Sequence, residues 1–109
     1  EYNGSMPGVL KNGLDWMTRP SGDAKRVFGG RAVALLGATP GGLGTALAQI
    51  AWLPVLRNLG ARPWFEGRLM VSRAHELFTP AGELRDEALR EQLRGFLRGF
   101  AAFASPPSR

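Results

Sequence analysis

The sequence lacks cysteine altogether and contains a single histidine, His75, among its 109 residues. The absence of cysteine excludes disulfide scaffolds, thiol catalysis and metal sites with thiolate ligands. One imidazole is too few for a histidine-based zinc site or for chemistry that needs two imidazoles. We therefore interpret His75 as a structural residue, and we expect no metal site.

The chain carries a modest excess of positive charge, with 14 Lys and Arg residues against 9 Asp and Glu residues and a formal net charge of +5. A basic balance raises nucleic acid and phosphate-bearing ligands as candidate partners. The basic residues are scattered, however, and most lie within a few positions of an acidic residue. This distribution favours a mixed, solvated surface, so we expect no nucleic-acid partner.

An uncharged run of 25 residues, at 32–56, is long enough to be mistaken for a membrane span. The run contains Gly37, Gly41 and Gly44 as well as prolines, which are typical of loops. It is better interpreted as a buried strand, a tight glycine loop and a helix. We expect no membrane segment and, because no signal or transit peptide follows Glu1, a cytoplasmic protein.

The alternation of apolar and glycine-containing segments predicts an α/β protein. Residues 31–37 form a short apolar run between glycines, which is typical of a strand buried on both faces of a parallel sheet. The C-terminal apolar stripe has helical spacing, and Asp86 with Arg90 fits a charge pair on its polar side. The expected elements are helices at 7–17, 45–59 and 83–104, strand pieces at 31–37, 61–65 and 68–72, a helical turn at 73–78, and a surface connection at 18–30, with Ser5 capping the first helix.

The number of strands is small for this architecture. A strand–helix unit takes about 30 residues, so an open doubly wound sheet of five strands needs roughly 150. The 109 residues supply two strands and three helices, in an ordinary globular composition of 44% hydrophobic and 21% charged residues. We therefore expect residues 1–109 to be the C-terminal portion of a single larger domain whose first strands lie upstream.

Two glycine-containing loops, at 1–8 and 37–44, are candidates for a ligand site. Loops at the carboxyl ends of adjacent parallel strands line the ligand crevice of an open α/β sheet, although each loop alone also fits a plain tight turn. The second loop resembles the glycine loop of short-chain dehydrogenases. That interpretation is disfavoured because Leu43 stands at the third glycine position, residues 57–65 contain no acid, and the only tyrosine is Tyr2.

Taken together, three segments resemble the NADPH-dependent FMN reductases, a family of the flavodoxin-like superfamily that includes chromate and quinone reductases. These segments are Glu1-Tyr-Asn-Gly-Ser-Met-Pro-Gly-Val-Leu-Lys-Asn-Gly-Leu-Asp-Trp16, Gly30-Arg-Ala-Val-Ala-Leu-Leu-Gly-Ala-Thr-Pro-Gly-Gly-Leu-Gly-Thr45 and Ser72-Arg-Ala-His-Glu-Leu-Phe78. The resemblance extends over essentially the whole chain. It implies a flavodoxin-like, doubly wound parallel sheet whose first strands and phosphate loop lie outside this chain.

The resemblance also implies a flavin site made from the two loops. The first loop would wrap the isoalloxazine ring of FMN, and the second would hold the pyrimidine edge of the ring, with Thr39 where many relatives have serine. The residues implied are Glu1, Tyr2, Asn3, Gly4 and Ser5 from the first loop and Thr39, Pro40, Gly41 and Gly42 from the second. Because the cofactor carries the chemistry, no catalytic side chain is expected.

NADPH or NADH would deliver hydride to the flavin, and a small-molecule acceptor such as a quinone or chromate would receive the electrons. Arg19 stands where relatives often carry arginine near the mouth of the site. It is a candidate for binding the NADPH phosphate or an anionic acceptor, across a subunit interface; a solvated arginine at a helix end is the alternative.

Relatives pair through the helices that flank the flavin, which implies a homodimer or homotetramer. Trp16, Trp52 and Trp64 are candidate core residues, and Trp52 is equally a candidate for the oligomer face. Two rival functions stay open: a flavin-free remnant that acts as an interaction or assembly module, and a basic nucleic-acid binder. The flavin interpretation requires Asn3 and Thr39 to lie at the same edge of the sheet.

Overall fold

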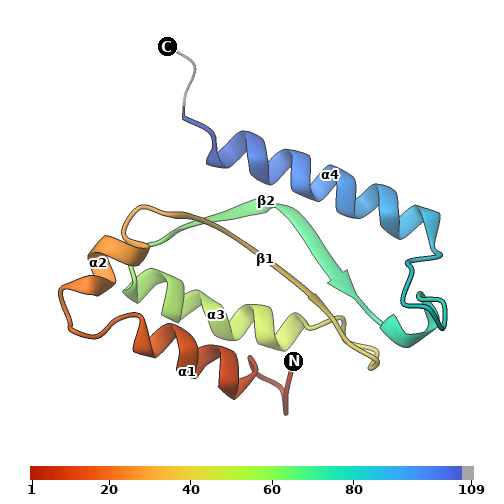
Figure 1. Ribbon diagram of the computed structural model, residues 1–109, viewed down its shortest axis with the longest axis horizontal. Helices are drawn as coiled ribbons and strands as arrows, with labels where there is room; N and C mark the ends of the chain where they lie inside the picture. Colours follow the sequence, from red (N-terminus) through yellow and green to blue (C-terminus); the bar gives the residue numbers. More distant parts are fainter. Residues whose placement is uncertain (107–109) are drawn as a thin grey trace.

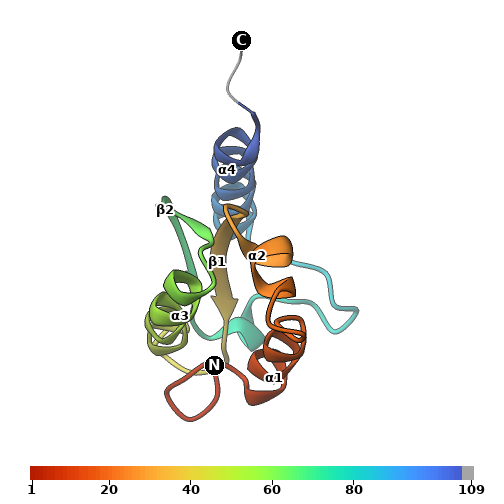
Figure 2. The same ribbon diagram turned by 90° about the vertical axis from the view of Figure 1, so that its left-hand side faces the viewer.

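The computed structural model describes residues 1–106, in which helices cover both faces of a two-stranded parallel sheet (Figure 1). Along the chain the elements are α1 (Gly8–Trp16), α2 (Asp23–Phe28), β1 (Ala32–Ala38), α3 (Ala46–Asn58), β2 (Arg62–Val71), a 3-10 turn (Ala74–Glu76) and α4 (Glu87–Ala104). Helix α4 lies on one side of the strands, and α1 and α3 lie on the other (Figure 2). The predicted α/β class and the parallel, doubly wound arrangement are confirmed.

The two strands are joined by the α3 crossover, and their pairing extends from Ala32 opposite Arg62 to Ala38 opposite Val71. The register shifts in the middle, because Ala34 pairs with Trp64 but Leu36 pairs with Leu69. Four residues of β2, 65–68, therefore lie opposite one residue of β1. The two predicted strand pieces are thus a single strand with an irregularity around Gly67, where the sequence indicated a break.

The core between the sheet and α4 is built around the indole of Trp64. Trp64, Leu69 and Phe96 are buried, and the six partly buried residues of the sheet and α4 that pack against them are Ala34, Val71, Leu89, Leu93, Phe100 and Phe103. The Trp64 and Phe96 rings meet edge to face, with centroids 5.2 Å apart at an interplanar angle of 64°. This geometry is favourable for aromatic pairs. The predicted apolar stripe of the last helix is confirmed as its sheet-facing side except at Leu97, which is 51% exposed.

Three predictions about helix ends and connections are wrong. Residues 18–30 contain α2, whose Phe28 is buried and so holds this segment against the body. Ser5 does not cap α1, because Pro7 is the residue that precedes the helix and no side chain bonds its first amides. Asp86 does not pair with Arg90, since its carboxylate caps α4 by accepting a hydrogen bond of 2.7 Å from the Leu89 N–H. Helix α4 consequently begins later than predicted.

The side of the sheet beyond β1 is open within residues 1–106. Strand β1 pairs only with β2, and Leu36 in its middle is 53% exposed. The expectation of a strand buried on both faces is therefore not met in the described residues. Helix α1 contributes no buried residue, and Trp16 is 71% exposed, so its predicted place in the core is wrong, whereas Trp52 and Trp64 are buried.

The uncharged run 32–56 is divided between β1, a loop and α3, as predicted. Among the described residues, no helix has the length and apolar character needed to cross a membrane. Only part of the run is buried in the described residues, since Leu43 and Ile50 are 64% and 61% exposed. Ala48, Trp52 and Leu56 form the buried stripe of α3 at four-residue spacing.

The packing of Trp64 against α4 leads to a testable prediction about two glycines. A Cβ added at Gly99 would lie 2.7 Å from Trp64 Cζ2, whereas a Cβ at Gly95, one turn earlier, meets nothing within 4 Å. We expect Gly99→Ala to lower the free energy of unfolding by about 1–3 kcal/mol through overpacking. Gly95→Ala should raise it by about 0.5–1 kcal/mol, because alanine favours helix. Denaturant unfolding measures both, and equal shifts would contradict this packing.

Candidate functional site

The first predicted loop is a tight two-residue turn. Tyr2 and Ser5 exchange both backbone hydrogen bonds, at 2.9 and 3.0 Å, and between them Asn3 and Gly4 have φ values of 48° and 74°. Two successive positive φ angles define a type I′ turn, for which Asn-Gly is the preferred sequence. The N–H groups of Asn3 and Gly4 donate to no other residue of the described chain, so both are free to bind a ligand.

The second predicted loop leaves the carboxyl end of β1 and is fixed by its own backbone and by β2. The Thr39 N–H donates to the Val71 carbonyl at 2.9 Å, and the Thr39 hydroxyl accepts a hydrogen bond of 3.2 Å from the Gly41 N–H. The hydroxyl proton of Thr39 has no acceptor among the described residues. The Gly42 N–H has no partner there either. This loop therefore presents a hydroxyl and an amide donor on a braced backbone.

A third segment, after β2, supports the second loop from behind. The Arg73 N–H donates to the Gly41 carbonyl at 3.0 Å, and the Ala74 N–H donates to the Thr39 carbonyl at 2.9 Å. The Ser72 hydroxyl donates to the Gly42 carbonyl at 3.1 Å. Sequence reasoning gave these residues no role in the site. Their position directly after the neighbouring parallel strand was the available signal, since such loops meet at one edge of the sheet.

The segment of the Asn3-Gly4 turn and the second loop both reach the start of α3. The Glu1 carboxylate accepts a hydrogen bond of 3.0 Å from the Ala48 N–H, and a Cβ at Gly4 would lie 3.5 Å from Leu47 Cδ1. Both contacts involve the first turn of the helix that the second loop leads into. Figure 1 shows the N-terminal segment beside this end of α3 and the end of β1. The nine residues predicted from the two loops therefore gather at one edge of the sheet.

The second loop is held in shape by a close approach between β1 and Thr45. Thr45 is 2% exposed and has a positive φ of 67°, and a Cβ at Gly37 would lie 2.2 Å from its Oγ1. Gln49 Nε2 donates to the same Oγ1 at 3.2 Å and to the Leu69 carbonyl at 3.1 Å. Only glycine at position 37 leaves room for Thr45, so the loop conformation depends on this residue.

The structure does not bring Arg19 to the two loops. Helix α1 begins beside the first turn and runs toward α2, and Arg19 follows its far end (Figure 1). The Arg19 guanidinium donates to the carbonyl and hydroxyl of Thr18, at 3.0 and 2.9 Å, and lines a cavity of about 370 Å³ with Asp15 and Asn58. Within one chain, Arg19 is therefore separate from the loop cluster.

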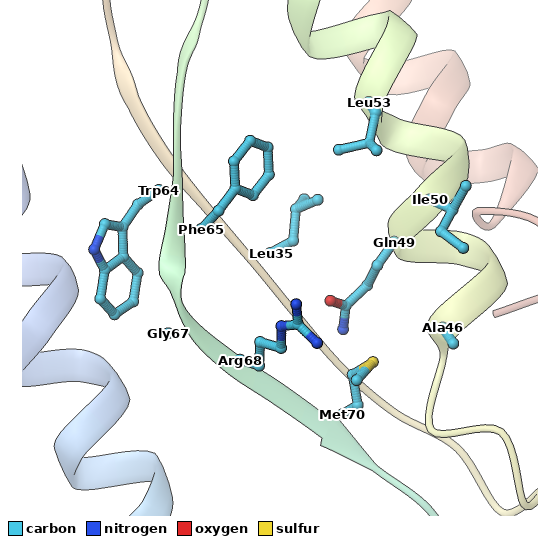
Figure 3. A pocket seen from close by; sticks show the side chains of 10 residues that line it. All are labelled: Leu35, Ala46, Gln49, Ile50, Leu53, Trp64, Phe65, Gly67, Arg68 and Met70. Atoms are coloured by element: carbon cyan, nitrogen blue, oxygen red, sulfur yellow. The ribbon is translucent and has the colours of Figure 1, made fainter.

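A larger cavity of about 470 Å³ lies between α3 and the strands (Figure 3). Its walls are mainly apolar, with Leu35, Leu53 and Phe65 among them, and Arg68 and Gln49 contribute polar groups. No residue of 1–5 or 39–42 lines this cavity. It is therefore a separate feature, and it does not hold the predicted ring.

The loop cluster has the properties needed to hold the edge of a planar polar ring. The free amides of Asn3, Gly4 and Gly42 suit carbonyl and ring-nitrogen acceptors, and the Thr39 hydroxyl adds a donor. Tyr2 is 73% exposed beside them and offers a flat apolar surface. Groups of three or more metal-ligating side chains are absent from residues 1–106. The donor set thus fits the isoalloxazine of FMN.

The parallel strands, the helices on both faces and the braced loops at their carboxyl edge define a flavodoxin-like α/β protein. Residues 1–76 match the sequence profile of the family described as NADPH-dependent FMN reductase, and the chain belongs to this family. The predicted family and fold are confirmed.

Individual relatives agree with this assignment. The chain is 40% identical, over 86% of its length, to an NAD(P)H-dependent FMN reductase of Pseudomonas aeruginosa, and 36% identical, over 94%, to a 2-hydroxy-1,4-benzoquinone reductase of a Burkholderia species. It covers 49% and 55% of these two proteins. Among solved structures it is similar to FerB, a flavoenzyme NAD(P)H:acceptor oxidoreductase of Paracoccus denitrificans, with a TM-score of 0.79, 33% identity and coverage of 94% of this chain and 55% of the other. The chain thus spans about half the length of these relatives.

The contact between β1 and Thr45 leads to a second prediction. In Gly37→Ala the new methyl group would overlap the Thr45 side chain, whereas a Cβ at Gly42 meets nothing within 4 Å. We expect Gly37→Ala to lower the free energy of unfolding by about 1–3 kcal/mol, and Gly42→Ala to change it by less than about 0.5 kcal/mol. Thermal or denaturant unfolding of the two variants tests the difference. A neutral Gly37→Ala would show that the loop does not depend on this close approach.

Proposed function

We propose that the protein containing this chain is an NAD(P)H-dependent FMN reductase, and that this chain supplies the part of the site that holds the isoalloxazine ring. The observation that carries the proposal is the Asn3-Gly4 turn, whose unpaired amides stand beside the braced loop of Thr39 and Gly42. The family assignment supports the same cofactor. Residues 1–109 are, in this proposal, the C-terminal portion of a single flavodoxin-like domain.

Bound FMN would supply the redox chemistry, taking hydride from a nicotinamide and passing electrons to an acceptor. The residues of this chain would bind and orient the ring. The amides of Asn3 and Gly4 and the hydroxyl of Thr39 are preorganised donors, and such donors stabilise the negative charge that a reduced flavin carries. The proposed function requires no side chain of the cluster to act as a nucleophile or a general base.

We propose a quinone as the electron acceptor, and chromate as a second acceptor that the same site accommodates. The names of the relatives support a quinone, because they include a 2-hydroxy-1,4-benzoquinone reductase and a quinone reductase of Pseudomonas putida. A cytoplasmic location, an assembly of two or four subunits, and the absence of nucleic-acid and membrane partners remain predictions from the sequence.

A flavin titration of the full-length protein tests the proposed function. We expect FMN to bind with a shift of its visible spectrum and with quenching of its fluorescence, and NADPH to bleach the bound flavin. Addition of a benzoquinone should restore the colour. A colourless protein that rejects added FMN would overturn the proposal and would favour the flavin-free interaction module instead.

The proposed role of Arg19 requires a second subunit, because this residue follows the far end of α1 and lines a cavity that contains no residue of the two loops. We expect Arg19→Ala to raise the KM for NADPH several-fold and the KM for NADH less, since only NADPH carries the additional phosphate. Arg98→Ala, an exposed arginine on α4, is the matched control and should leave both KM values unchanged. An unchanged KM for NADPH in Arg19→Ala would reject the role.

A further inference from the structure

Helix α3 begins without a cap of its own. Thr45, the residue before it, has a positive φ of 67°, and its side chain makes no capping hydrogen bond. The Ala46 N–H is bonded to the Leu43 carbonyl at 3.1 Å, which leaves the Leu47 and Ala48 amides to be satisfied from outside the helix. Unsatisfied amides in the first turn destabilise a helix, and acidic groups are favourable there.

The missing cap is supplied from 47 positions away in the sequence. The Glu1 Oε2 atom accepts the Ala48 N–H at 3.0 Å, and the Glu1 side chain is partly buried there. Ala48 itself is 5% exposed, so the bond is sheltered from water on the helix side. A hydrogen bond that an amide N–H donates to a carboxylate is stronger than one between neutral groups. The bond between Glu1 and Ala48 joins the segment of the Asn3-Gly4 turn to α3, the helix that follows the second loop.

We propose that Glu1 is a positioning residue that clamps the two flavin-binding loops together through the N-terminus of α3. This inference rests on the proposed function. The Asn3-Gly4 turn has few other ties to α3: Gly4 lies against the Leu47 side chain, and the backbone bonds of Tyr2 and Ser5 are internal to the turn. Without the carboxylate, the turn is free to move relative to Thr39.

The carboxylate also brings a negative charge to the site. The N-terminus of α3 carries a partial positive charge, and Glu1 is bonded directly to it. The Glu1 charge would therefore offset part of the positive electrostatic potential that the N-terminus of α3 exerts on a bound ring. Because a reduced flavin is anionic, the charge of Glu1 disfavours reduction. Geometry and charge are thus two separable contributions of one side chain.

Two substitutions at Glu1 separate these contributions. In Glu1→Gln the amide oxygen can still accept the Ala48 N–H, but the charge is lost. We expect FMN affinity within about twofold of the unsubstituted protein and a more positive reduction potential. In Glu1→Ala the hydrogen bond to Ala48 and the charge are both lost. We expect FMN to bind about five- to tenfold more weakly, as for the loss of a helix cap. Glu66→Gln, an exposed carboxylate on β2, is the matched charge control and should change neither.

The measurements use the full-length protein, with FMN affinity from fluorescence quenching and the potential from dye-coupled reduction. Hydrogen exchange of the flavin-free protein adds a readout without cofactor: exchange of the Ala48 amide should accelerate in Glu1→Ala and stay slow in Glu1→Gln. If the unsubstituted protein rejects FMN, the proposed function fails. If it binds FMN and Glu1→Ala binds equally tightly with unchanged Ala48 exchange, the clamp is wrong. A potential in Glu1→Gln equal to that of Glu66→Gln would overturn the charge contribution.

Discussion

The arrangement of this protein depends on the parallel pairing of β1 with β2. Parallel strands need a crossover, and here α3 returns the chain so that both strands end at the same edge. The pairing continues past the strands, because Thr39 donates to Val71 and then accepts from Ala74. The loop after β1 and the segment after β2 are in this way joined backbone to backbone, although they lie about 30 residues apart in the sequence. A ligand at this edge meets a rigid surface rather than two independent loops.

The rigidity of the second loop comes from its neighbours more than from its own composition. Thr45 adopts a positive φ, which is unfavourable for a β-branched residue, and persists because Gly37 makes room for it and Gln49 bonds its hydroxyl. Strain of this kind is typical of binding loops, where conformation matters more than stability. It also explains why α3 has no local cap and takes one from Glu1.

The described residues pack less closely around β1 and α1 than they do around α4. Strand β1 has one neighbour, α1 buries none of its residues, and Val9 and Trp16 are 88% and 71% exposed. The core on the α4 side is closed, because Trp64 fills the space left by Gly67 and Gly99. The chain covers 49% and 55% of two of its relatives, so each of them is about twice as long.

Local sequence patterns were sufficient for much of the fold and for the identity of the two loops. Hydrophobic spacing predicted α4 and the strands, and Asn3-Gly4 together with the glycines after β1 marked the loops, because these signals act over a few residues. Other features required tertiary contacts: α2, which buries Phe28; the use of Asp86 as a cap; the exposure of Trp16; and the bracing of the second loop by Ser72 and Arg73. The hydrogen bond that the Ala48 N–H donates to Glu1 likewise depends on the tertiary structure. A sequence shows which groups are able to donate or accept, but only the folded chain decides which distant partners come within 3 Å of one another.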